Sequence, residues 1–106
     1  MRVADLTSLR RYHDRVIAYG ASDIEPVSHG NAISVYCRDP EQNKIELYID
    51  TPWYCEQPLR EAIDLRDSDF EILRKTEDLA RQRPNFVARE VWEKQMVERM
   101  KSHQSD

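Results

Sequence analysis

The sequence predicts a single α+β domain with one N-terminal helix, an antiparallel sheet and two C-terminal helices. Apolar residues recur at helical spacing over residues 5–19, alternate with polar residues over residues 32–50, and return to helical spacing after residue 68. The length of 106 residues suits one domain. A domain of this size buries about two thirds of the surface of its unfolded chain.

The first predicted helix runs from about Asp5 to Tyr19. Asp5 or Thr7 can cap its N-terminus, and Gly20 suits the position just past its end. His13 lies outside the apolar stripe, so we interpret it as an ordinary surface or boundary histidine. The stripe itself consists of Leu6, Leu9, Tyr12, Val16, Ile17 and Tyr19.

Residues 32–50 are predicted to form two antiparallel strands joined by a tight loop. Side chains of a strand alternate between its faces, so one face of this hairpin is apolar and should pack against the helix. If Arg38 and Lys44 pair at the two ends of the loop, the register places Tyr36 opposite Glu46 on the other face.

Glu46 is the best ligand candidate in the chain. A carboxylate in the middle of a sheet face is costly to cover unless it is paired, hydrogen-bonded or bound to a metal, and Tyr36 cannot neutralise it. The alternative is a solvent-facing glutamate, because antiparallel sheets often leave one face exposed to water.

Two further segments flank the hairpin. Residues 22–27 are expected to form a short strand or connector, and Pro26 indicates that it lies at a sheet edge. Residues 51–58 are predicted to be an irregular connector, because their two prolines limit regular pairing.

The C-terminal part is predicted to be helical. Ser68 and Glu71 form a capping box ahead of a helix that runs to about Arg83. After Pro84, a second, charged amphipathic helix is expected, followed by a frayed tail over residues 102–106. Its stripe of apolar residues is interpreted as a packing surface, within the chain or between chains: Val87, Val91, Trp92, Met96 and Met100.

Composition narrows the classes of protein that the chain can represent. The formal net charge of −4 argues against a nucleic-acid partner, because such binding relies on clustered Lys and Arg. The sequence contains no apolar stretch of about 20 residues, so no membrane association is expected. No secretory signal is visible. We therefore expect a cytoplasmic protein in which Cys37 and Cys55 are reduced.

Several short motifs in the first half of the chain carry a resemblance to a known family. They are His29-Gly30, Ile33 to Tyr36, Asp39-Pro40 with Asn43, Ile45 to Tyr48, and Asp50 to Trp53. Together they resemble the end of a module of the vicinal oxygen chelate superfamily. The likeness is greatest to extradiol ring-cleaving dioxygenases of the catechol 2,3-dioxygenase and biphenyl-2,3-diol dioxygenase type. Glyoxalase and bleomycin-resistance proteins are more distant relatives.

This resemblance implies a domain organisation. Residues 1–58 would form a truncated βαβββ module, and residues 59–106 a C-terminal helical extension of the same domain. The first strand of a complete module supplies a metal-binding histidine, and most of that strand is missing ahead of Val3. Gln42 stands where the family loop has glycine, and a non-glycine residue in a left-handed conformation costs about 1 kcal/mol.

The resemblance also implies roles for individual residues. Glu46 matches the glutamate that binds the active-site metal, usually Fe(II) in the dioxygenases. Tyr36 matches a tyrosine that hydrogen-bonds the metal-bound catecholate oxygen. His29 resembles a catalytic histidine near the start of the same strand. The substrate would be an aromatic diol.

Three interpretations follow from the number of metal ligands. An oxygen-activating Fe(II) site of this kind needs two histidines and one carboxylate, and only Glu46 is evident. The first is an extradiol dioxygenase-like protein whose site a partner completes. The second is a non-catalytic dimeric protein that binds small molecules, and the third is an inactive remnant. The missing strand should leave an open sheet edge. We therefore expect a homodimer, or a partner chain that carries the missing module.

Overall fold

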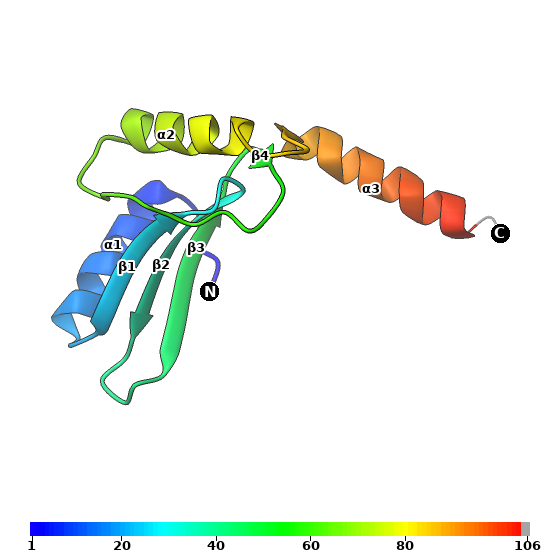
Figure 1. The fold of residues 1–106 in the computed structure, drawn as a ribbon. Coiled ribbons are helices and arrows are strands. Elements are labelled where there is room, and N and C mark those ends of the chain that lie inside the picture. The colour runs from blue at the N-terminus through cyan, green and yellow to red at the C-terminus, as the bar shows by residue number, and fades with distance from the viewer. Residues whose placement is uncertain (105–106) are drawn as a thin grey trace.

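The computed structural model describes residues 1–104 and has an α+β fold, as the sequence predicts (Figure 1). Its strands form a four-stranded antiparallel sheet in the order β3-β2-β1-β5 and a separate two-stranded ribbon of β4 and β6. The elements in chain order are α1 (Leu6–Ala18), β1 (Ser22–Ser28), β2 (Ala32–Arg38), β3 (Lys44–Asp50), β4 (Trp53–Tyr54), β5 (Glu61–Ala62), α2 (Asp69–Arg81), β6 (Val87–Ala88) and α3 (Arg89–Gln104).

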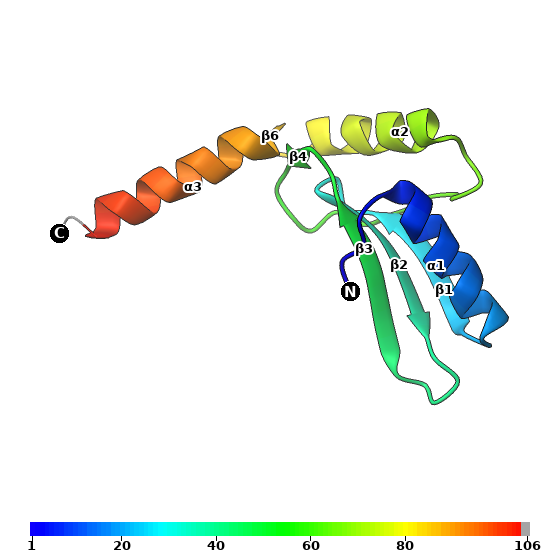
Figure 2. The ribbon, with the colours of Figure 1, turned by 180° about the vertical axis from the view of Figure 1, so that it is seen from behind.

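Helix α1 forms where the apolar spacing predicts it. Asp5 is the N-cap, because its side chain accepts a hydrogen bond of 2.8 Å from the Ser8 N–H, and Thr7 lies inside the helix. Gly20 follows the helix with a φ of +93°, a left-handed conformation that suits glycine. Figure 2 shows α1 against one face of the sheet.

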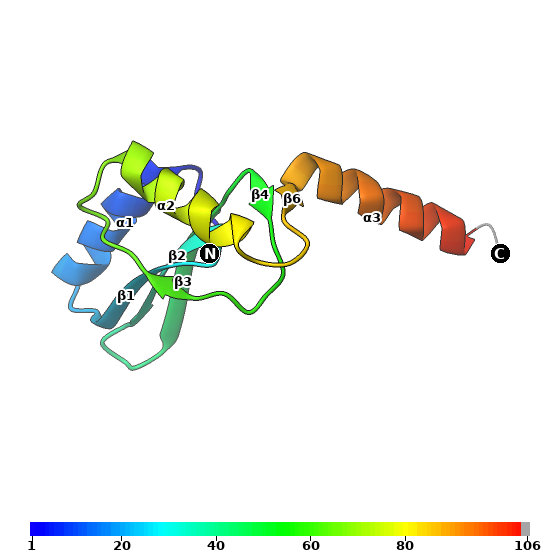
Figure 3. The same ribbon diagram turned by 45° about the horizontal axis from the view of Figure 1, so that its top comes forward.

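The core lies between α1, the apolar face of the sheet and α2. Helix α2 crosses the end of the sheet, as Figure 3 shows, and contributes Ile72 to the core. The buried cluster consists of Val3, Leu6, Leu9, Ile33, Val35, Leu47, Ile49, Leu65 and Ile72. The predicted packing of the first helix on the Ile33, Val35 and Leu47 face is confirmed.

The β2–β3 hairpin has the predicted strands and register. Arg38 pairs with Lys44, and Tyr36 lies opposite Glu46. Gln42 adopts the expected left-handed conformation, with a φ of 71°. The loop is held by the Asp39 carboxylate, which accepts hydrogen bonds from nearby N–H groups, and the bonds from Asn43 are the main cause of its lowered pKa.

Strand β1 differs from the expectation that Pro26 marks a sheet edge. The strand pairs with β2 on one side and, near its end, with the short β5 on the other. The Pro26 carbonyl accepts a hydrogen bond of 3.1 Å from the Ile63 N–H, so the proline nitrogen also faces this second side. The missing N–H therefore removes nothing from the long ladder with β2.

The segment after the hairpin also differs from the prediction. Residues 51–58 are not wholly irregular, because Trp53 and Tyr54 pair with residues 87–88 to form the β4–β6 ribbon. The ribbon joins two segments that lie far apart in the chain. No local pattern in either segment predicts such a pairing.

The C-terminal helices are present with small changes in extent. The Ser68 side chain caps α2, but Glu71 completes only half of the predicted capping box, because its carboxylate pairs with Arg74. Helix α2 ends at Arg81, slightly before the predicted Arg83. Helix α3 extends to Gln104, so the predicted frayed tail is helical over residues 102–104, and residues 105–106 lie outside the described part.

Helix α3 projects from the body of the molecule (Figures 1 and 3). The predicted apolar stripe is present only in part: Trp92 and Met96 are half-buried, Val87 lies in β6, and the other apolar residues are spread around the helix. Val91, Val97 and Met100 are exposed at 45%, 48% and 59%. Within residues 1–104, no helix combines the length and apolar character needed to cross a membrane.

Candidate functional site

The candidate site lies on the sheet face opposite α1. Alternation along β2 and β3 places Ser34, Tyr36, Glu46 and Tyr48 on this face, while their neighbours in the strands enter the core. The structure brings together all three residues that the sequence singles out, since His29 contacts Tyr36.

His29 is held in one orientation by two hydrogen bonds. It lies in the turn between β1 and β2, where Gly30 adopts a φ of +75°. Its Nδ1 lies 2.7 Å from the Leu59 carbonyl oxygen, and its Nε2 lies 2.9 Å from the Tyr36 hydroxyl. A carbonyl only accepts hydrogen bonds, so Nδ1 carries a proton. In the neutral ring, Nε2 is then the acceptor of the Tyr36 O–H.

Glu46 is half-buried and has a polar support within the sheet. The hydroxyl of Ser34, a fully buried residue, donates a hydrogen bond of 2.9 Å to Glu46 Oε2. This bond offsets part of the cost of covering a carboxylate. Burial, followed by the neighbouring Glu46 carboxylate, raises the pKa of Tyr36 above its ordinary value. The phenol is therefore protonated at neutral pH.

Two arginines, which the sequence analysis did not identify, also belong to the site. The Arg60 guanidinium lies 4.6 Å from the centre of the Tyr36 ring and pairs with Glu25. Arg89, the first residue of α3, donates from Nε to the Thr51 carbonyl at 2.8 Å. Both arginines come from segments outside the hairpin, and no local motif marks either of them.

A shallow hollow of about 410 Å³ lies beside these groups. Its walls carry carboxylates from β3, an imidazole, an amide and a cation, which suits a small polar molecule. The side chains that define it are those of His29, Glu46, Tyr48, Asp50, Gln57 and Arg89.

The described residues do not fit a complete Fe(II) site. No group of three His, Cys, Asp or Glu side chains within them is arranged to hold a metal ion. Both ring nitrogens of His29 are engaged in hydrogen bonds. Asp50, the other carboxylate of the hollow, lies 3.4 Å from Arg2. Glu46 therefore offers one carboxylate, which does not by itself make the three-ligand set of a ferrous site.

The remaining histidine and cysteine candidates lie elsewhere. His13 lies beside Asp14 on α1, on the other side of the sheet from Glu46, as expected for a boundary histidine. Cys37 and Cys55 are both buried and free of disulfides. Burial raises the pKa of each thiol, which keeps both protonated and unreactive.

Comparison of the chain with protein-family models, curated proteins and solved structures found no match.

Proposed function

We propose that the chain is a vicinal oxygen chelate module of the extradiol dioxygenase type, and that its Glu46 face forms one half of a site for an aromatic diol. The order of elements supports the proposal. Residues 1–3 lie beside β3, where Arg2 forms a parallel bridge with Tyr48 and the Val3 N–H donates to the Tyr48 carbonyl at 2.8 Å. With α1 and β1–β3, this bridged segment gives the order extended segment, helix and three strands.

The observation that carries the proposal is the placement of Tyr36 opposite Glu46 with His29 hydrogen-bonded to the phenol. These groups provide an acceptor for one diol hydroxyl and a phenol–imidazole pair for the other. An imidazole that receives a hydrogen bond from a phenol can accept its proton, which suits general acid–base chemistry.

A ferrous site requires ligands that the described residues do not supply. In this proposal Glu46 provides the carboxylate, and two histidines come from a second chain. Association through β3 suits this arrangement. Residues 1–3 hydrogen-bond with β3 only at Glu46 and Tyr48, and the strand extends beyond them to Lys44 at its outer edge.

The first experiment measures diol binding and iron content separately. We expect 2,3-dihydroxybiphenyl to bind the protein, and Glu46→Gln and Tyr36→Phe each to weaken that binding. When the protein is purified anaerobically with its partner chain, Glu46→Gln should also lose bound Fe(II), whereas Tyr36→Phe should retain it. Glu98→Gln, which changes an exposed carboxylate on α3, is the matched control.

The same experiment identifies the results that contradict the proposal. If wild-type protein binds no diol at any concentration tested, or if Glu98→Gln weakens binding as much as Glu46→Gln, the Glu46 face is not the site. Ring cleavage should be absent from the isolated chain. Robust turnover by that chain alone would show that its ligand set is complete.

A second candidate function is a non-catalytic dimeric protein that binds small molecules, as in the bleomycin-resistance relatives. The incomplete ligand set favours it. Such a protein would bind the diol with equal affinity in the presence and absence of Fe(II). An inactive remnant would bind neither the diol nor Fe(II).

Light scattering tests the expectation, shared by the first two functions, that the chain associates with another chain. A strictly monomeric mass at high micromolar concentration would contradict it.

A further inference from the structure

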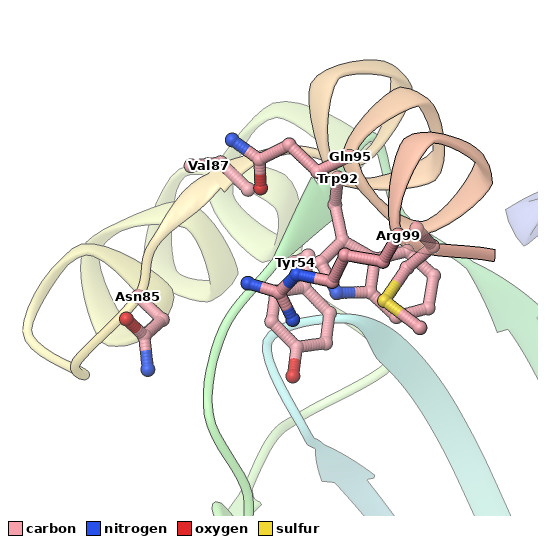
Figure 4. Close-up of a pocket in the computed structure, with 7 residues that line it drawn as sticks. Tyr54, Asn85, Val87, Trp92, Gln95 and Arg99 are labelled. Atoms are coloured by element: carbon pink, nitrogen blue, oxygen red, sulfur yellow. The ribbon is translucent and has the colours of Figure 1, made fainter. Parts of the chain in front are cut away.

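A second cavity, of about 270 Å³, lies where α3 meets the β4–β6 ribbon (Figure 4). It shares no lining residue with the hollow beside Glu46. The residues that give it its chemical character are Tyr54, Asn85, Trp92, Gln95, Met96 and Arg99.

One wall of this cavity is aromatic. The Trp92 ring stacks on the Tyr54 ring, with centroids 4.5 Å apart and an angle of 14° between the planes. Met96, one helical turn after Trp92, adds a polarizable thioether to the same wall. Trp92, Tyr54 and Met96 are half-buried, so this wall is partly covered by protein and partly open to a ligand.

The remaining lining carries exposed polar side chains that have no protein partner within the described part of the chain. The side chains of Asn85, Gln95 and Arg99 make no hydrogen bond or ion pair there. Two other cations of α3 do have partners. Lys94 lies 3.6 Å from Glu90, and Arg89 donates to two carbonyl groups.

We propose that this cavity binds a small aromatic carboxylate. The Arg99 guanidinium supplies donors that match the two oxygens of a carboxylate, and the amides of Asn85 and Gln95 supply further donors. The Tyr54–Trp92 wall supplies a surface for a planar ring. A volume of about 270 Å³ suits a molecule with one ring. A neutral ring would leave Arg99 without a partner, and an aliphatic acid would lose the aromatic contact.

The test uses benzoate as the probe and NMR of the full chain as the readout. The protein has two tryptophans, and Trp53→Phe identifies which indole N–H signal belongs to Trp92. We expect the Trp92 signal to shift and saturate as benzoate is added. Benzamide, which lacks the charge, and cyclohexanecarboxylate, which lacks the aromatic ring, should both bind more weakly.

Variants of two cations on α3 test the role assigned to Arg99. Arg99→Gln should raise the dissociation constant for benzoate about tenfold or more, as expected for loss of a charge-assisted hydrogen bond. Lys94→Gln, which removes a neighbouring exposed cation, and Glu46→Gln, which changes the other face, should leave binding unchanged. A Trp92 signal that does not move with benzoate would overturn the inference. Equal weakening by Arg99→Gln and Lys94→Gln would do the same.

Discussion

The Tyr36 hydroxyl lies 2.9 Å from Nε2 of His29 and has a single proton to donate. Because the Leu59 carbonyl requires a proton on Nδ1, Nε2 of a neutral His29 accepts a hydrogen bond from the Tyr36 O–H. The Leu59 carbonyl, by fixing the proton on Nδ1, thus makes His29 Nε2 the acceptor for the Tyr36 phenol.

The first prediction concerns the titration of Tyr36. Burial and the Glu46 carboxylate raise the pKa of Tyr36 above its ordinary value of 10.0, so Glu46→Gln should lower it. Spectrophotometric titration of tyrosinate, with Tyr36→Phe used to identify the signal, measures the change. Glu98→Gln is the control and should leave the titration unchanged.

The same shift determines the pH dependence of stability. Folded Tyr36 keeps its proton at pH values where the unfolded phenol loses it. Its contribution is fully present below about pH 10 and is lost as pH rises through the folded pKa. Glu46→Gln should reduce this alkaline loss. An unchanged alkaline loss in the variant would contradict the assigned role of Glu46.

The second prediction compares the two glycines. Gly20 and Gly30 both have positive φ, so alanine is strained at either position. A Cβ on Gly20 would lie 3.7 Å from Pro40, an ordinary contact, whereas a Cβ on Gly30 would lie 2.6 Å from Cys55 Sγ. Gly20→Ala should lower the free energy of unfolding by about 1 kcal/mol, and Gly30→Ala by about 2 to 4 kcal/mol. Urea denaturation measures both, and equal losses would show that the Cys55 side chain moves aside freely.

The third prediction concerns a buried hydroxyl in α2. Thr76 is fully buried, and its Oγ1 has no hydrogen-bond partner in the part of the chain that the structure describes. Thr76→Val keeps the shape and removes the polar atom, so the free energy of unfolding should rise by about 1 kcal/mol. Thr76→Ser keeps the hydroxyl and removes a methyl group, which should lower it by about 1 kcal/mol. A loss of stability in Thr76→Val would mean that the hydroxyl is hydrogen-bonded in solution.

The fourth prediction concerns Arg89, which connects the start of α3 to the sheet. It donates from Nη2 to the Asn31 carbonyl at 2.5 Å, and the Thr51 N–H donates to the same carbonyl at 3.0 Å. Lysine cannot reproduce this forked donation. Arg89→Lys should therefore lower the free energy of unfolding by about 1 to 2 kcal/mol and speed hydrogen exchange at the Thr51 amide. Arg99→Lys, a change on the same helix outside this network, should leave both measurements unchanged.

The sequence by itself determined the elements whose causes are local. Period-two alternation and a five-residue loop are sufficient to define the β2–β3 register, and this register places Tyr36 opposite Glu46. The capping role of Asp5 and the left-handed conformation of Gln42 are equally local. His29 could be named as a candidate because it lies at the entrance to the same hairpin.

Only the tertiary structure decided which distant segments complete the site. The Leu59 carbonyl that orients His29, the Arg60 that covers Tyr36 and the Arg89 beside the hollow all lie beyond the hairpin. The β4–β6 ribbon likewise joins residues more than thirty positions apart. Such contacts join segments that are far apart in the sequence, and they depend on where the connecting segments place each one in the fold. The periodicity within a segment does not determine them. Propensity and alternation describe a segment's own conformation, whereas its partners are selected by the packing of the whole domain.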